Sequence, residues 1–178
     1  TENWHRPHYE SRVVMSLMRR YIVREVDEVD RNEVRVTFIG QRERLPAGLQ
    51  RLMAQVETRT AGNRRLHVQV ALSYGSRAEI ARAARRIAAE VAAGRLCPGA
   101  ITEETVSGAL DTAGTVDPDL VIRTSGEMRV SNFLLWQAAY AEFAFVRECW
   151  PDFTPELFAA VIEDYARRER RFGRVSAA

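Results

Sequence analysis

The chain contains no lysine, so all 26 of its basic residues are arginine. Every cation in the protein is therefore a planar guanidinium that stays charged at physiological pH and is suited to binding oxyanions. A bias in codon usage is the simplest origin, and the chemical consequence is the same. With 24 acidic residues the formal net charge is only +2, which is too small to indicate a nucleic-acid partner.

Cysteines and long apolar runs are scarce as well. Cys97 and Cys149 are far apart, with no Cys-x-x-Cys pair and no histidine at metal-ligand spacing. This pattern argues against a zinc site or a disulfide framework and predicts reduced thiols in a cytoplasmic protein. No apolar run approaches the roughly 20 residues that a membrane-spanning helix needs.

The first residues show neither a methionine nor a signal peptide nor a leading structural element. A motif, TENWHRP, begins at once at Thr1. We therefore expect one domain over residues 1–178 that lacks its N-terminal section. A chain of 178 residues is long enough for a single domain with a real core.

Hydrophobic periodicity predicts alternating helices and strands. Apolar residues at a period of 3.6 predict a long helix from His8 to about Val29, and β-branched alternation predicts a strand from Val34 to Ile39. Further helices are expected at 47–61, from 76 to about 93, at 102–110, at 133–141 and from 155 onwards, and further strands at 66–72, 119–123 and 143–146. Helices of crossover length between strands predict a parallel α/β sheet with flanking helices.

Polar residues at several helix starts predict caps. Ser76 and Glu79 have the spacing of a capping box. Thr102 is expected to cap the helix at 102–110, and Ser131 or Asn132 the helix at 133–141. Thr154 with Pro155 is expected to start the last helix.

The stretch from Pro118 to Asp152 holds the strongest candidate site. Arg123 ends a predicted strand, Arg129 follows in a turn that contains glycine, and Ser131 stands at a predicted helix start. Arginine forks bind phosphate oxygens bidentately, and a helix N-terminus adds backbone donors. Glu142 is a carboxylate among apolar residues, and Mg²⁺ commonly combines few protein carboxylates with substrate phosphates. The stretch therefore predicts a phosphate or diphosphate site.

The residues alone leave a second interpretation open. Arg123 and Glu142 could each form a structural ion pair while Ser131 only caps a helix. In the same way, TENWHRP could be a segment that leads into a helix, with Trp4 as a hydrophobic staple.

Five segments together resemble the cis-prenyltransferases, the family of undecaprenyl diphosphate synthase. TENWHRP resembles the family's S-T-E-N-W-x-R-P segment, and SYGSR resembles its N-Y-G-G-R turn. DLVIRTSGEMRVSNFLLWQAAYAEF resembles its most diagnostic block, and WPDF and RRERRFG resemble its closing signatures. The likeness covers essentially the whole chain in order.

The resemblance implies an α/β fold, a parallel sheet with flanking helices and a hydrophobic tunnel, one wall of which would be the helix from His8 to Val29. It implies an enzyme that condenses isopentenyl diphosphate onto an allylic diphosphate, such as farnesyl diphosphate, with Mg²⁺. The product would be a polyprenyl diphosphate carrier lipid. It also implies a homodimer and peripheral contact with the membrane through that lipid.

The resemblance assigns roles to individual residues. It implies that Asn3 assists proton removal and that Glu142 contributes to Mg²⁺ binding. Substrate binding would involve Thr1, Glu2, Trp4, Arg6, Arg123, Arg129, Val130, Ser131, Arg171 and Gly173. Of these, Arg171 and Gly173 match an R-x-G ending that, in the family, approaches an active site across a dimer interface.

The chain departs from the family at two notable places. The family's D-G-N-G-R-W-A motif, which handles Mg²⁺ and the allylic diphosphate, is absent, and Met128 stands where histidine is common. Two other functions therefore stay open: a non-catalytic cis-prenyltransferase-like subunit, and a diphosphate-binding module without lipid chemistry.

Overall fold

The computed structural model describes residues 8–168, with side chains from residue 16 onwards. The chain forms two compact units, residues 1–113 and 114–178. The helices and strands of the first unit are α1 (His8–Arg31), β1 (Val34–Ile39), η2 (Arg42–Arg44), α2 (Ala47–Thr60), β2 (Leu66–Ala71), α3 (Ser76–Ala92), η3 (Pro98–Ala100) and α4 (Glu103–Gly108). Those of the second unit are β3 (Leu120–Arg123), β4 (Glu142–Phe145), η4 (Trp150–Asp152) and α5 (Pro155–Ala166).

Each unit is built on a pair of parallel strands. In the first unit β1 pairs with β2 from Val34↔Leu66 to Ile39↔Ala71. In the second unit β3 pairs with β4 from Leu120↔Glu142 to Arg123↔Phe145. The predicted α/β class with parallel strands and flanking helices is confirmed.

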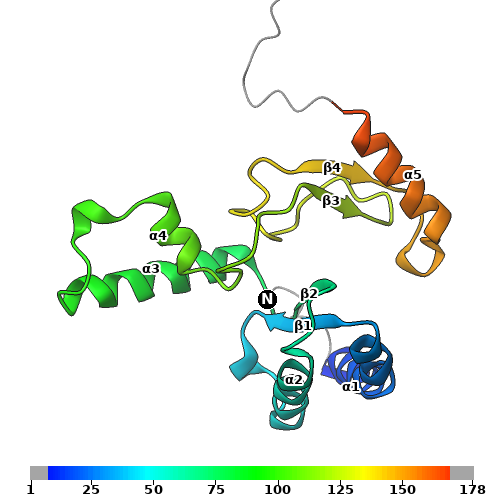
Figure 1. Ribbon diagram of the computed structural model, residues 1–178, viewed down its shortest axis with the longest axis horizontal. Helices are drawn as coiled ribbons and strands as arrows, with labels where there is room; N and C mark the ends of the chain where they lie inside the picture. The colour runs from blue at the N-terminus through cyan, green and yellow to red at the C-terminus, as the bar shows by residue number, and fades with distance from the viewer. Residues whose placement is uncertain (1–7, 169–178) are drawn as a thin grey trace, which may run out of the picture. The chain divides into compact units, whose positions relative to one another are not determined.

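The core of the first unit lies between the β1–β2 pair and two helices. Figure 1 shows α1 and α2 on the same side of this pair. Met53 on α2 is fully buried, at 0% exposure, against Val36 and Phe38 of β1. Residues of α1 pack against this cluster at helical spacing, namely Met18, Ile22, Val26 and Val29. The stripe that predicted the first helix is therefore the face that meets the sheet.

Polar side chains of α2 and the turn after it close the outer edge of β1. In a parallel strand, alternate residues direct both their N–H and C=O groups away from the partner strand. Glu57 accepts a hydrogen bond from the Phe38 N–H at 2.9 Å. Thr60 Oγ1 accepts one from the Val36 N–H at 3.1 Å, and the Asn63 amide donates to the Val34 C=O at 3.1 Å. These residues take the place of a neighbouring strand, so this edge cannot extend the sheet.

Gly40 ends β1 at a point where a side chain does not fit. Its φ is +109°, and a Cβ there would lie 2.1 Å from the Leu72 carbonyl oxygen. Only glycine tolerates both the backbone conformation and this close approach. The backbone at Gly40 therefore packs directly against the backbone at Leu72, where the paired strands β1 and β2 end side by side.

The predicted capping box at the start of α3 is wrong. Gly75, not Ser76, is the N-cap of α3, and no side chain caps it. Glu79 is 1% exposed and accepts hydrogen bonds from Tyr74 Oη at 2.5 Å and from the Asp111 N–H at 2.8 Å. The Glu79 carboxylate therefore binds Asp111, 32 residues away, in place of the backbone at the start of α3. The caps predicted at Thr102 and Thr154 are confirmed, since each accepts a hydrogen bond from the backbone three residues ahead.

The helix predicted at 133–141 is also wrong, because this segment is a series of turns. Ser131, Asn132 and Leu134 have φ values of +50°, +60° and +47°. A left-handed residue cannot continue a right-handed helix, so these positions prevent the helix from starting. Ala138 donates to the Leu134 C=O at 2.8 Å, and Ala141 donates to the Ala138 C=O at 3.1 Å, each closing one turn only.

Within the described part of the chain, no helix has both the length and the apolar character that crossing a membrane requires. Cys97 and Cys149 are both free, and both are exposed.

Candidate functional site

Arg123 is the last residue of β3, where the carboxyl end of the strand opens into the following connection. Its C=O accepts a hydrogen bond from the Val146 N–H at 2.9 Å, so its backbone is held by the strand pair. Its side chain is half-buried, and among residues 16–168 no acidic side chain pairs with its guanidinium. A partly desolvated cation without a counter-ion favours the binding of an anion.

The first turn after Arg123 is anchored to the segment after β4. Ser125 donates its N–H to the Glu148 C=O at 2.7 Å, and Gly126 donates to the Val146 C=O at 2.8 Å. Both residues have a positive φ, +68° and +67°. These two hydrogen bonds hold the turn that follows Arg123, and the strand pairing holds the backbone before it. The backbone position of Arg123 is therefore fixed from both directions along the chain.

Arg129 and Ser131 follow in the same connection and are both exposed. Arg129 forms an ion pair with Glu127, a carboxylate that is about one-third exposed. An anionic substrate would therefore have to displace Glu127 to bind this guanidinium. The half-buried Val130 accepts a hydrogen bond from the Phe133 N–H at 3.3 Å, which closes a turn at the predicted substrate contact.

Because no helix follows Ser131, one part of the sequence argument does not hold. Ser131 neither caps a helix nor offers a helix dipole to a phosphate, so a phosphate here would be bound by guanidinium groups, hydroxyls and turn N–H groups. Such turn N–H groups can themselves form an anion-binding concavity.

Glu142 lies at the other end of the strand pair from Arg123. The register places Glu142 beside Leu120 and Arg123 beside Phe145. The two rows are three residues apart, which is about 10 Å along the strand. Because side chains alternate between faces, Arg123 shares a face with Phe145, and Glu142 lies on the opposite face. The structure therefore does not bring these two predicted site residues together.

The carboxylate of Glu142 already has a cationic partner. Arg168, just beyond α5, donates from Nη1 to Glu142 Oε2 at 3.1 Å. Glu142 is thus half of an ion pair in this structure, as the second interpretation of the sequence expected. For Arg123, no such ion pair is found among the described residues.

The described residues leave the predicted magnesium role of Glu142 untested. Within residues 16–168, no three acidic, histidine or cysteine side chains lie close enough to hold a metal ion. Mg²⁺ in proteins is often held by only one or two carboxylates together with substrate phosphates, so it does not require such a cluster. The metal role of Glu142 stays a prediction.

The remaining predicted site residues lie outside the described part of the chain. They are Thr1, Glu2, Asn3, Trp4, Arg6, Arg171 and Gly173. Their predicted roles are untested by this geometry.

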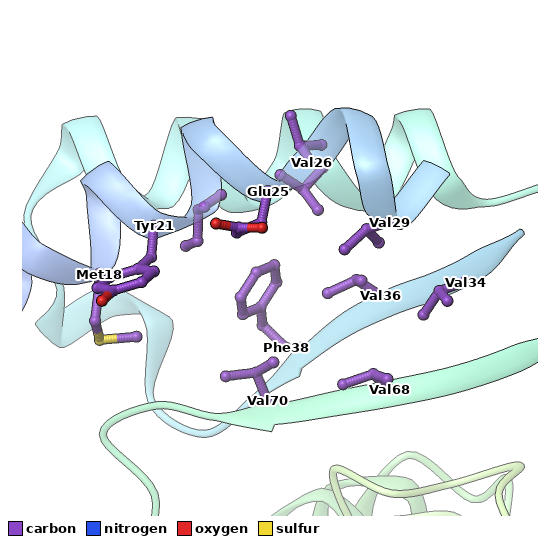
Figure 2. Close-up of a pocket in the computed structure, with 12 residues that line it drawn as sticks. Met18, Tyr21, Glu25, Val26, Val29, Val34, Val36, Phe38, Val68 and Val70 are labelled. Carbon is purple, nitrogen blue, oxygen red and sulfur yellow. The ribbon is translucent and has the colours of Figure 1, made fainter. Parts of the chain in front are cut away.

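The first unit contains an apolar pocket of ≈ 260 Å³ between α1 and the β1–β2 pair. Figure 2 shows Met18, Val26 and Val29 of α1 facing Phe38 of β1 and Val70 of β2. Among the described residues that line it, Glu25 alone is charged, and Arg24 Nε donates to this carboxylate at 2.5 Å. A pocket with such walls suits a hydrocarbon.

Sequence reasoning missed a buried charge network at the carboxyl ends of β1 and β2. Asp111 accepts from Arg82 at 2.5 Å and from the Gly40 N–H at 3.2 Å. Its own N–H donates to Glu79, which also binds Tyr74 in the turn before α3. Asp111 lies 71 residues from Gly40 in the sequence, so no local pattern predicts their contact. The network fastens α3 and two loops to the end of β1.

The comparisons with known proteins agree with these features. Residues 1–173 match the prenyltransferase family model described as "Putative undecaprenyl diphosphate synthase". The chain belongs to this family. It is 53% identical over 173 residues to an isoprenyl transferase of Agrobacterium fabrum, covering 97% of this chain and 70% of that protein. An isoprenyl transferase of Geobacter sulfurreducens is 47% identical over 176 residues, covering 99% of this chain and 72% of that protein.

Two solved structures share the fold. Lavandulyl diphosphate synthase from Lavandula x intermedia, in complex with dimethylallyl diphosphate, has a TM-score of 0.94 and 35% identity, covering 97% of this chain and 75% of that one. A probable undecaprenyl diphosphate synthase from Campylobacter jejuni has a TM-score of 0.86 and 36% identity, covering 97% of this chain and 79% of that one.

Proposed function

We propose that this protein elongates a prenyl diphosphate by condensing isopentenyl diphosphate onto an allylic diphosphate such as farnesyl diphosphate. The observation that carries the proposal is Arg123, a half-buried guanidinium without an acidic partner among residues 16–168, at the carboxyl end of a parallel strand. Ligands of open parallel sheets bind at this end. Membership of the prenyltransferase family supports the reaction class.

In this proposal the diphosphate of isopentenyl diphosphate is bound by Arg123, Arg129 and Ser131, with the backbone of Val130 in contact. Bidentate guanidinium contacts fix the orientation of the diphosphate as well as its position. Arg129 exchanges Glu127 for the substrate when it binds. Thr1, Glu2, Trp4 and Arg6 contribute to the substrate site, and Asn3 assists removal of the proton from the condensing unit.

The growing chain is a hydrocarbon and needs an apolar cavity. The pocket between α1 and the β1–β2 pair supports the predicted tunnel, because its walls are almost entirely valine, methionine and aromatic side chains. We assign this pocket to the prenyl chain. The assignment rests on its chemistry, since a buried isoprenoid gains stability from each methylene that leaves water.

Magnesium, a homodimer in which Arg171 and Gly173 reach the partner's site, a cytoplasmic location and peripheral membrane contact through the lipid product complete the proposal. When bound, magnesium would neutralise charge on the diphosphates. The polyprenyl diphosphate product would serve as a carrier lipid.

The direct test uses the full-length protein with radiolabelled isopentenyl diphosphate, farnesyl diphosphate and Mg²⁺. We expect label in products longer than farnesyl diphosphate. If no product forms while isopentenyl diphosphate still binds, a non-catalytic subunit or a diphosphate-binding module replaces the enzyme.

A further inference from the structure

The first half of α1 carries a basic surface that the proposed reaction does not use. Its residues recur at the three- and four-residue spacing of one helix face and line a shallow depression there, namely Ser16, Arg19, Arg20, Val23 and Arg24. We call these five residues the arginine face. The three arginines are exposed, and the sequence from Ser16 to Arg24 contains no acidic residue. Among residues 16–168, no acidic side chain pairs with Arg19 or Arg20.

The carboxylates nearest to the arginine face along α1 already have arginine partners. Glu25 accepts a hydrogen bond from Arg24 Nε at 2.5 Å. Asp27 lies one turn after Val23 and accepts from Arg59 Nη1 of α2 at 2.6 Å. These carboxylates therefore do not neutralise the other two arginines of the face, which keep their charge for an anionic partner.

Large apolar side chains are exposed among these cations. Val23 is 57% exposed, Tyr21 is 55% exposed and Leu17 is 42% exposed. The guanidinium carbon of Arg24 lies 4.9 Å from the centre of the Tyr21 ring, so a cation and an aromatic ring are presented together. Arginines combined with exposed apolar side chains are typical of helices that lie on a membrane surface.

The same half of α1 borders the apolar pocket. Met18 and Tyr21 line the pocket from this helix (Figure 2). Tyr21 is therefore both a wall of the pocket and an exposed side chain next to Arg24. Because a helix is only about 10 Å across, a hydrocarbon in the pocket lies close to whatever the arginine face contacts.

We propose that the arginine face of α1 docks on the surface of an anionic lipid bilayer. Charge complementarity supports this partner, because guanidinium groups bind phosphate oxygens and a lipid surface presents many of them. The apolar side chains beside the arginines would enter the headgroup region, a contact that a soluble acidic partner does not provide.

The inference rests on the proposed function only for its purpose. A polyprenyl diphosphate has to pass from the pocket into a bilayer, and a docked α1 shortens that path. The contact itself is made by the protein, so it goes beyond membrane contact through the lipid product and is measurable without any substrate.

The test is vesicle co-sedimentation of the full-length protein in the absence of substrates. We expect binding to phosphatidylcholine vesicles that contain about 30% phosphatidylglycerol, weakening as the salt concentration rises, and no binding to phosphatidylcholine alone. The double variant Arg19→Gln/Arg20→Gln should bind about 25-fold more weakly, or about fivefold for each arginine. The matched control, Arg51→Gln/Arg85→Gln, removes the same charge from exposed positions on α2 and α3 and should bind as the parent does.

Two further measurements separate the apolar contact and the reaction from the charge. Val23→Ser should weaken vesicle binding by about threefold at every salt concentration, because salt does not screen an apolar contact. Prenyl transfer in detergent solution should be unchanged in Arg19→Gln/Arg20→Gln, because neither arginine lines the pocket.

Four results would overturn the proposal. An equal loss of binding in Arg51→Gln/Arg85→Gln would assign the effect to net charge. Displacement from the vesicles by soluble polyglutamate, with Val23→Ser binding as the parent does, would indicate an acidic protein partner. Binding that appears only after product has formed would leave the lipid product as the sole contact, and no vesicle binding at all would exclude docking. If the parent transfers no prenyl group, the proposed function fails, and the vesicle data still decide on the arginine face.

Discussion

The two strand pairs of this protein differ in whether the polar groups beside them already have binding partners. At the outer edge of β1, the side chains of Glu57, Thr60 and Asn63 satisfy backbone groups, so little polar capacity remains for a ligand. At the end of β3, Arg123 has no acidic partner among the described residues, and the exposed Arg129 pairs with Glu127.

The difference follows from what connects the strands. The regular helix α2 joins β1 to β2. Glu57 and Thr60 on this helix, and Asn63 just after it, are spaced three residues apart. They bind the backbone of alternate residues of β1. Turns with a positive φ connect β3 to β4 instead. Such backbone costs stability and typically persists where function requires it. Changes near β1 should therefore alter stability, and changes near β3 should alter activity.

The largest effect is expected for Arg123→Ala. Loss of a bidentate guanidinium contact with diphosphate should reduce kcat/KM for isopentenyl diphosphate by about 100-fold, while the melting temperature changes little. Steady-state kinetics and calorimetry measure the two quantities. Arg147→Ala removes an exposed arginine in the same unit and should be silent. A normal KM and kcat in Arg123→Ala would remove this residue from the site.

Glu57→Ala should produce the reverse pattern. Glu57 accepts from the Phe38 N–H at 2.9 Å and from Arg42 Nη1 at 2.7 Å, so the variant leaves both donors without this acceptor. We expect a loss of about 3 kcal/mol in the free energy of unfolding. Denaturant titration measures it, and Glu43→Ala, at an exposed position of η2, is the control. Unchanged stability would show that α2 does not close the edge of β1.

Thr60→Val isolates a single edge contact with almost no change of shape. The Thr60 side chain is fully buried, at 0% exposure, and its hydroxyl binds the Val36 N–H and donates to the Val56 C=O at 2.8 Å. The valine variant should be less stable by about 1–2 kcal/mol. Hydrogen exchange at the Val36 amide should also become faster. Wild-type exchange at that amide would contradict the assignment.

Ser131→Ala should have a smaller effect on the other strand pair. The side chain is exposed and supplies one neutral hydroxyl, so we expect the KM for isopentenyl diphosphate to rise by about threefold. Ser125→Ala, in the neighbouring turn, is a useful comparison because its hydroxyl donates to the Thr124 C=O at 2.6 Å. An equal KM increase in both variants would point to the connection as a whole rather than to Ser131.

The smallest effect concerns pH and the β1–β2 pair. Partial desolvation of the largely exposed His67 ring, and then the nearby charge of Arg35, lowers the pKa of His67 below its ordinary value of 6.5. The unfolded chain therefore binds a proton more readily, so this contribution to stability is present above pH 6.5 and is lost as the pH falls through the folded pKa. His67→Gln should flatten the dependence of stability on pH in that window, as measured by denaturant titration at several pH values. An unchanged slope would exclude His67 as its source.

The sequence by itself determined the order and type of most elements. Periods of 3.6 and 2.0 residues are local properties, and they predicted the helix from His8, the strands that begin at Val34 and Leu66, and the caps at Thr102 and Thr154. The five motifs also predicted the family, because motif order along a chain needs no three-dimensional information.

Only the tertiary structure decided which polar groups meet. Glu79 has the spacing of a capping residue, yet it binds Asp111, which is 32 residues away. Glu142 and Arg123 belong to one motif in the sequence, yet the strand register separates them. The positive φ of Ser131 overrode a helical pattern in the residues that follow it. In each case a contact between distant segments, or a backbone conformation, outweighed a local preference. A pattern in neighbouring residues cannot predict this, because it contains no information about distant contacts.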